Sequence, residues 1–211
     1  MLGLAIHTTS PELGLAISDF RGEFRHQVWP LGRDLSSCLH VYLADFIQPQ
    51  TWRDLTFIAV VTGPGGFTGT RIGVVTARTL AQQLEIPLFG VSTLAALAEG
   101  ARSRLIHYAA GRFPDIAVQL PAQRGELFGA LYQLSDHSGL IPLFPDTVLT
   151  QESWLEKLNS WPTDYHLIKA EGGLAASVKH VLTLADHDWR QGQRPHWSKV
   201  LPFYGQHPVD L

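Results

Sequence analysis

One segment of the chain constrains the fold more than any other: an apolar, β-branched run that leads into a glycine-rich loop and then into a helical pattern. The run is Phe57–Thr62, the loop begins at Gly63, and the helical pattern covers Thr70–Leu84. A short run of this kind is typical of a strand that is buried on both faces. A second such run, Pro87–Val91, follows the helix. The order strand, loop, helix, strand predicts a parallel βαβ unit and hence an α/β fold.

The remaining segments indicate that the chain contains a similar plan twice. Three strands are expected before the βαβ unit, and two paired strands with a third extended stretch open the second half. Each half then continues with a strand, a glycine turn and a helix. We therefore expect two lobes, residues 1–104 and 105–211. The strands expected outside the βαβ unit are Leu2–Ile6, Leu13–Ser18, Glu23–Trp29, Asp115–Leu120, Glu126–Leu134, Leu140–Leu149 and Tyr165–Lys169.

Two of the expected helices have a capping residue directly before them. Ser92 precedes one and Thr150 precedes another, and a hydroxyl at this position accepts a hydrogen bond from an amide of the first helical turn. The helices expected outside the βαβ unit are Arg33–Ile47, Thr93–Gly100, Gln151–Leu158 and Leu174–Asp186.

Composition narrows the class of protein. The 211 residues carry a net charge of −3, which provides no basic footprint for direct nucleic-acid binding. Cys38 is the single cysteine, so no intramolecular disulfide is possible. The apolar start Met1–Ile6 is short and lacks a basic flank, which favours a strand over a signal peptide. No apolar run approaches the roughly 18 residues of a membrane span. We expect a cytoplasmic protein without membrane association.

The glycine-rich loop has two interpretations. A strand that turns through glycines into a helix N-terminus forms a concavity where backbone N–H groups and the helix dipole attract an anion. A structural turn with tight helix–strand packing uses the same residues. The loop lacks the Gly-Lys-Ser/Thr ending of a nucleotide-binding P-loop and is not G-x-G-x-x-G. The candidate anion- or nucleotide-proximal residues are Gly63, Gly65, Gly66, Thr68, Gly69 and Thr70.

At this loop the sequence resembles a known family. Gly63–Gly73 resembles the G-P-G-S-F-T-G-x-R-I-G signature of the bacterial TsaB (YeaZ) family, with Gly66 in place of Ser. Other segments are similar to that family in the same order, and the strong resemblance covers residues 2–100. These segments are Leu4–Thr9 (LAIHTT), Gly90–Leu97 (GVSTLAAL), Pro121–Glu126 (PAQRGE) and Pro202–Tyr204 (PFY).

The resemblance implies a two-lobed actin-like fold of the ASKHA, RNase H-like class, with mixed sheets and flanking helices. It also implies a scaffold subunit that binds the transferase TsaD. With a TsaE-like ATPase, that pair attaches the threonylcarbamoyl group to N6 of adenosine 37 in tRNA. On this hypothesis the chain has no catalytic residue, metal site or cofactor of its own. It contacts tRNA only indirectly through the complex, and it forms a possible homodimer when alone.

Departures from related enzymes favour this non-catalytic interpretation. His7 stands where actin-like phosphotransferases, and usually the TsaB family, have an Asp, and imidazole is a poor ligand for magnesium. None of the ten histidines has a second histidine four residues later, the spacing of the TsaD metal pair. Two alternatives remain: an ATP-dependent phosphotransferase of the actin-like class, and a degenerate relative of metallopeptidases.

The resemblance also predicts where the partner binds. In the family, two helices of the first lobe pack against their counterparts in TsaD as a four-helix bundle. In the helix Thr70–Leu84, the spacing of Val74, Ala77, Ala81 and Leu84 predicts burial against the sheet. The predicted interface is the mixed stripe beside them together with an apolar strip that widens the first helix. The alternative is that these residues cover the core of their own lobe. The predicted interface residues are Cys38, Val41, Tyr42, Arg71, Val75, Arg78, Thr79 and Gln82.

Overall fold

The chain folds around two mixed β-sheets. Residues 1–105, 113–135, 139–203 and 205 are described by the structure, which is a computed structural model. The first sheet has the strand order β3-β2-β1-β4-β5, in which β1 pairs antiparallel with β2 and parallel with β4. The second has the order β8-β7-β6-β9. The strands are β1 (Gly3–His7), β2 (Leu13–Ser18), β3 (Phe24–Trp29), β4 (Phe57–Gly63), β5 (Leu88–Ser92), β6 (Asp115–Pro121), β7 (Leu127–Ser135), β8 (Gly139–Leu149) and β9 (Tyr165–Lys169).

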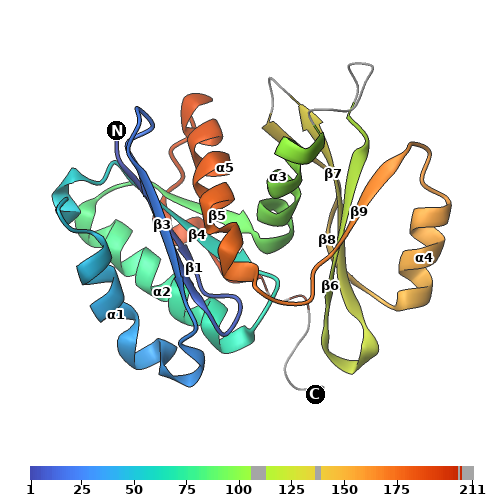
Figure 1. The fold of residues 1–211 in the computed structure, drawn as a ribbon, viewed down its shortest axis with the longest axis horizontal. Coiled ribbons are helices and arrows are strands. Elements are labelled where there is room, and N and C mark those ends of the chain that lie inside the picture. Colours follow the sequence, from blue (N-terminus) through green and yellow to red (C-terminus); the bar gives the residue numbers. More distant parts are fainter. Residues whose placement is uncertain (106–112, 136–138, 204, 206–211) are drawn as a thin grey trace.

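Helices cover these sheets in layers (Figure 1). One pair lies on the outer face of the first sheet, a second pair lies between the sheets, and α4 covers the outer face of the second sheet. β1 is buried throughout because its two faces both pack against helices: Leu4 and Ile6 belong to the core on the α1 and α2 side, and Ala5 belongs to the core under α5. The helices are α1 (Leu35–Phe46), α2 (Phe67–Leu84), α3 (Thr93–Leu105), α4 (Gln151–Asn159) and α5 (Val178–Arg190).

The last helix returns to the first sheet. After β9 in the second sheet, the chain passes through the turn Leu174–Ser177 and enters α5. Val178, Val181 and Ala185 of α5 are fully buried in one core cluster with residues of β1, β2 and β4. Chain beyond residue 104 thus also builds the layer over the first sheet. The division into residues 1–104 and 105–211 stays a prediction.

The expected fold class is confirmed, and the caps lie where the sequence indicates. Ser92 accepts hydrogen bonds from the amides of Leu94 and Ala95 at 3.0 and 3.2 Å, and Thr150 accepts one from Ser153 at 3.1 Å. Several boundaries differ from the predicted ones: α3 continues to Leu105 instead of ending at Gly100, and α5 covers Val178–Arg190 instead of Leu174–Asp186. In addition, α2 begins at Phe67, three residues before the predicted start at Thr70. Part of the glycine-rich segment is therefore helical.

Candidate functional site

Two glycines of the loop adopt backbone conformations that other residues rarely adopt. Gly63 has a φ of 110° and Gly65 a φ of 154°. Glycine permits these positive φ values because it has no Cβ. Gly66 has an ordinary φ of −61° and directly precedes α2.

The loop packs tightly against the residues that follow β1. The amide of Gly66 donates to the carbonyl of Thr9 at 2.6 Å, and the hydroxyl of Thr8 donates to the carbonyl of Gly69 at 2.8 Å. A Cβ at Gly65 would overlap the carbonyl oxygen of Thr9, and one at Gly69 that of Thr8. These two glycines therefore allow two backbone segments to approach each other. The Gly66 amide, one of the donors that an anion would use, is occupied by the protein itself, which supports the structural interpretation.

This packing predicts that Gly69→Val lowers the stability of the protein by about 1–3 kcal/mol, because the new side chain meets a backbone atom that cannot rotate away. Thermal or urea unfolding measures the effect. Gly66→Ser is the matched control in the same loop, since a Cβ there would lie 3.4 Å from the nearest atom, and its stability should stay within about 0.5 kcal/mol of the parent. Equal stability of both variants would mean that the loop is tolerant surface.

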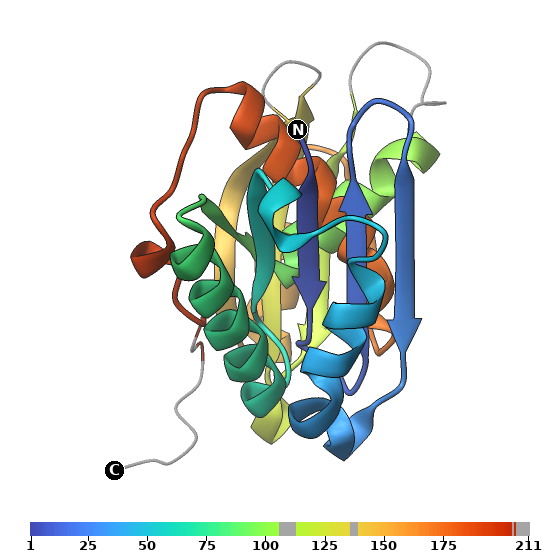
Figure 2. The same cartoon turned by 90° about the vertical axis from the view of Figure 1, so that its left-hand side faces the viewer.

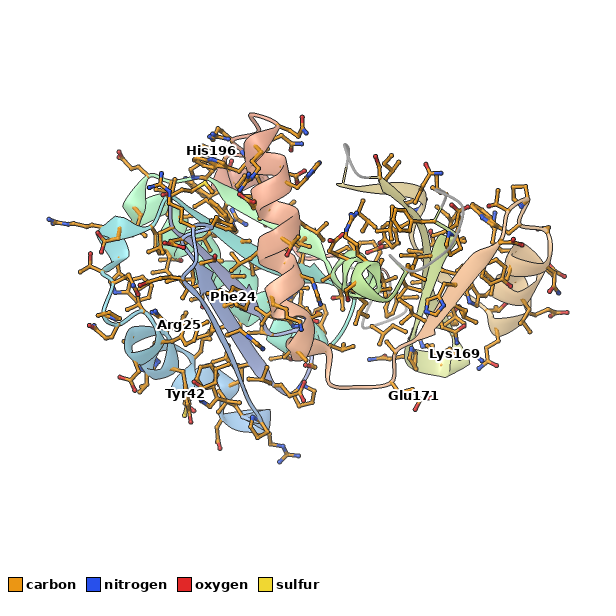
Figure 3. All side chains as sticks on the ribbon, turned by 45° about the horizontal axis from the view of Figure 1, so that its top comes forward. Phe24, Arg25, Tyr42, Lys169, Glu171 and His196 are labelled. Carbon is orange, nitrogen blue, oxygen red and sulfur yellow. The ribbon has the colours of Figure 1, made fainter. Side chains whose placement is uncertain are left out.

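A cleft of about 1170 Å³ opens beside the loop and is lined by residues from both halves of the chain. Its charged residues are Glu12, Arg33 and Glu171, two carboxylates and one guanidinium. The Glu12 carboxylate accepts hydrogen bonds from the Ser10 hydroxyl at 3.1 Å and from the Ala175 amide at 3.4 Å. Figure 3 shows Glu171 on the side of the second sheet. A lining with more negative than positive groups is poorly suited to a polyphosphate.

His7 is fully buried at the end of β1. Its Nδ1 accepts a hydrogen bond from the Thr9 amide at 3.4 Å, and its Nε2 has no hydrogen-bond partner among the described residues. Burial lowers the pKa of His7 to about 3, so the imidazole is neutral at physiological pH. The position that holds a carboxylate in the phosphotransferases carries no charge here.

The predicted stripe on α2 lies on its surface rather than in the core. Val75 is 60% exposed, whereas Val74, Ala77 and Ala81 on the sheet side are fully buried. Arg71, Thr79 and Gln82 are exposed, and Arg78 is half-buried with its guanidinium 5.8 Å from the centre of the Trp197 ring. The α2 stripe therefore lies at the surface of the protein, with Arg78 half-buried at its edge.

The strip on α1 points in a different direction. Tyr42 packs against Trp29 of the edge strand β3, with 5.0 Å between ring centres, and Cys38 is half-buried. Val41 is 51% exposed. Figure 3 shows Tyr42 and His196, which lies next to Trp197, at opposite ends of the first lobe. The structure thus places the strips of α1 and α2 on opposite flanks of the helix pair, and their union in one interface stays a prediction.

One polar cluster between the two sheets was not predicted. Asp146 of β8 accepts hydrogen bonds from Ser92, the last residue of β5, at 2.5 Å and from Tyr132 of β7 at 2.7 Å. Burial raises the pKa of Asp146, and the two hydroxyl donors offset part of that rise. The cluster lines a cavity of about 300 Å³. Its members lie 14 to 54 residues apart, so no local pattern could reveal it. Within the described part of the chain, no group of three His, Cys, Asp or Glu residues is placed to hold a metal ion.

Comparison with known proteins places the chain in a family. The family described as "TsaD: tRNA N6-adenosine threonylcarbamoyltransferase" matches residues 47–153, just over half of the chain. The "tRNA threonylcarbamoyladenosine biosynthesis protein TsaB" of Bacillus subtilis (strain 168) is 36% identical over 163 residues, which cover 74% of this chain and 65% of that protein. The Escherichia coli (strain K12) protein of the same name is 37% identical over 87 residues, 41% of this chain and 35% of that protein. The matched region thus spans less than two thirds of the length of these relatives.

Solved structures share the fold. A crystal structure of "an uncharacterized protein with similarity to peptidase YEAZ from Pseudomonas aeruginosa" superposes with a TM-score of 0.77 at 22% identity, over 97% of this chain and 99% of that one. The structure titled "YeaZ from Pseudomonas aeruginosa" gives a TM-score of 0.74 at 21% identity, over 96% and 99% of the two chains. Family match, relatives and fold agree: the chain belongs to the TsaB (YeaZ) family, within the wider group that the TsaD match defines.

Proposed function

We propose that the protein is a non-catalytic subunit required for threonylcarbamoylation of N6 of adenosine 37 in tRNA, and that it binds and supports a TsaD-like transferase. The observation that carries the proposal is the exposed stripe of α2, where Val75 is 60% exposed beside fully buried neighbours. Relatives of this chain are named for threonylcarbamoyladenosine biosynthesis, and the family match bears the name of the transferase itself. A transferase-like fold with an exposed mixed stripe on one helix suits a partner of that enzyme.

The glycine loop and β1 support the absence of independent catalysis. In an actin-like phosphotransferase the end of the first strand supplies a carboxylate, whereas His7 is neutral and buried. The Gly66 amide donates to Thr9 rather than being held open for a phosphate. Both features favour a structural role for the loop over phosphate binding.

The remaining partners follow from the same proposal. A TsaE-like ATPase joins the pair, tRNA is contacted through the complex, and the free subunit forms a homodimer. No cofactor is assigned, and the protein acts in the cytoplasm. Among the helices that the structure describes, none is long and apolar enough to cross a bilayer.

Two measurements test the proposal. Size-exclusion chromatography of the protein mixed with a TsaD-like transferase should give a complex that elutes ahead of either component, and the mixture should support tRNA threonylcarbamoylation that neither protein supports alone. The isolated chain should not hydrolyse ATP at the 1–10³ s⁻¹ typical of enzymes. ATP turnover in that range by the isolated chain, or the lack of any complex, would contradict the subunit assignment.

A further inference from the structure

The chain crosses between its two sheets at two junctions. By the larger part of their core packing, α1, α2 and α5 belong with the first sheet and α3 and α4 with the second, and these two groups are the lobes. One junction is Ser92–Thr93, where β5 ends and α3 begins, and the other is the segment 170–173 after β9. Figure 1 shows α3 and α5 between the sheets, and Figure 2 looks along this stack from the side of α1 and α2. A change of the angle between the lobes must be absorbed at these junctions.

The second junction contains two glycines with open space around them. Gly173 has a φ of 65°, and a Cβ at Gly172 or Gly173 would meet no atom within 4 Å. Glycines in such surroundings can change their φ and ψ at little cost. Directly after them the chain is fixed to the first lobe, because the amide of Ala175 donates to the Glu12 carboxylate at 3.4 Å. Gly172 and Gly173 therefore provide a pivot that offers little resistance to rotation.

The first junction is held from both sides by neighbouring hydroxyl groups. The Ser92 hydroxyl donates to Asp146 of β8 at 2.5 Å, and Tyr132 of β7 donates to the other oxygen of that carboxylate at 2.7 Å. The Thr93 hydroxyl donates to the carbonyl of Pro64 in the glycine-rich loop at 2.6 Å. One residue of the junction is thus bonded to the second lobe and the next residue to the first lobe. We call the side chains of Ser92, Thr93, Tyr132 and Asp146 the latch.

The hydrogen bonds of the latch have one arrangement of protons, and they continue into the glycine-rich loop. Ser92 Oγ accepts two amides of α3, so its single proton goes to Asp146. Thr93 gives its proton to the loop, so the Thr9 hydroxyl, 3.2 Å away, donates to Thr93. The carbonyl of Thr9 accepts the Gly66 amide at 2.6 Å. The latch and the loop therefore form one connected network.

The cleft of about 1170 Å³ beside the loop lies between the same two lobes. Gly65–Gly69 line it from the first lobe, and Leu120 and Pro121 line it from the second. Rotation of one lobe against the other would move these two walls relative to each other. The width of the cleft is therefore set by whatever fixes the angle between the lobes.

We propose that the latch locks the angle between the two lobes and thereby fixes both the width of the cleft and the position of the glycine-rich loop. Gly172 and Gly173 permit rotation at one junction, and the latch opposes it at the other. This inference concerns the chain by itself, so it does not rest on the proposed function.

The test compares two carboxylates that each accept two side-chain hydrogen bonds. The carboxylate of Asp146 joins the lobes, whereas that of Asp115 accepts the Trp161 indole and the Thr163 hydroxyl within the second lobe. Asp146→Ala and Asp115→Ala therefore remove equal numbers of hydrogen bonds, but only the first releases the latch. Both variants should be less stable than the parent, so the control accounts for the effect of lower stability.

The distance between the lobes is measured by electron paramagnetic resonance between two spin labels. The labels are attached to the full chain at Arg53→Cys in the first lobe and Glu156→Cys on α4, two exposed positions, and Cys38→Ser removes the native thiol. Asp146→Ala should shift the mean distance by about 2 Å or more or broaden its distribution, whereas Asp115→Ala should match the parent.

Amide hydrogen exchange tests the connection to the glycine-rich loop. The Gly66 amide should exchange about tenfold faster in Asp146→Ala than in Asp115→Ala, because its acceptor Thr9 is no longer held through the latch. Tyr132→Phe removes one hydroxyl of the latch and keeps the ring, so it should change both readouts in the same direction. This variant decides the question if Asp146→Ala does not fold. Distances and exchange rates equal to those of Asp115→Ala would overturn the inference, because core packing alone would then hold the lobes.

Discussion

Val75→Glu should weaken binding to a TsaD-like partner by about 2–5 kcal/mol, because it buries an unpaired charge at the centre of the interface. The thermal midpoint of the isolated subunit should hardly change, since Val75 is 60% exposed and an exposed position tolerates charge. The two measurements together, binding by calorimetry and unfolding by differential scanning, separate a loss of contact from a loss of fold.

Arg78→Glu provides the second variant of this experiment. It should also weaken assembly strongly, because it reverses a charge on the same stripe and removes the contact with Trp197. Leu155→Glu serves as the exposed control on the other lobe. A Val75→Glu subunit that unfolds early, yet binds normally per folded molecule, would show that this face of α2 belongs to the core.

The stability of the protein should fall steeply with acid because of His7. Its pKa is about 3 in the folded protein and 6.5 in the unfolded chain, so below pH 6.5 the unfolded state binds a proton that the folded state excludes. The contribution is complete above pH 6.5 and is lost as the pH falls toward 3. The slope approaches about 1.4 kcal/mol per pH unit below pH 6, which amounts to roughly 2 kcal/mol between pH 6.5 and 4.5.

His7→Asn isolates this contribution. The asparagine oxygen can accept the Thr9 amide in place of Nδ1, but the side chain does not titrate in this range. The free energy of unfolding in urea should therefore decline less for the variant than for the parent between pH 6.5 and 4.5, whatever their difference at neutral pH. Parallel pH profiles would mean that the folded protein accommodates a charged imidazole.

Features set by neighbouring residues were predictable from the sequence. The buried runs that form β4 and β5 and the two hydroxyl caps have the expected positions. The predicted start of α2 at Thr70 is wrong because the glycine pattern before it is typical of a loop. Gly69 is helical and serves instead to let the Thr8 carbonyl approach. Glycine is required at this position for packing. The local sequence pattern is the same whether a glycine marks a loop or lets two backbone segments approach each other.

Features set by distant residues were not predictable. The apolar strip of α1 gave no sign that Tyr42 would turn toward Trp29 on the edge strand rather than toward α2. The position of His7 at the end of an expected strand gave no sign that its side chain would be completely buried. The cluster at Asp146 joins two sheets, so it exists only once both have formed.

The return of α5 to the first sheet has a consequence for synthesis on the ribosome. The last strand of that sheet ends at Ser92, yet the helix that covers Ala5, Ala16 and Phe57 ends at Arg190. At about 5–20 residues per second, translation delays this helix by on the order of 10 s. During that time the emerging sheet holds one apolar face open to solvent. The nascent chain is therefore most vulnerable to aggregation before its final 35 or so residues appear, and a chaperone that shields that face would act in this interval.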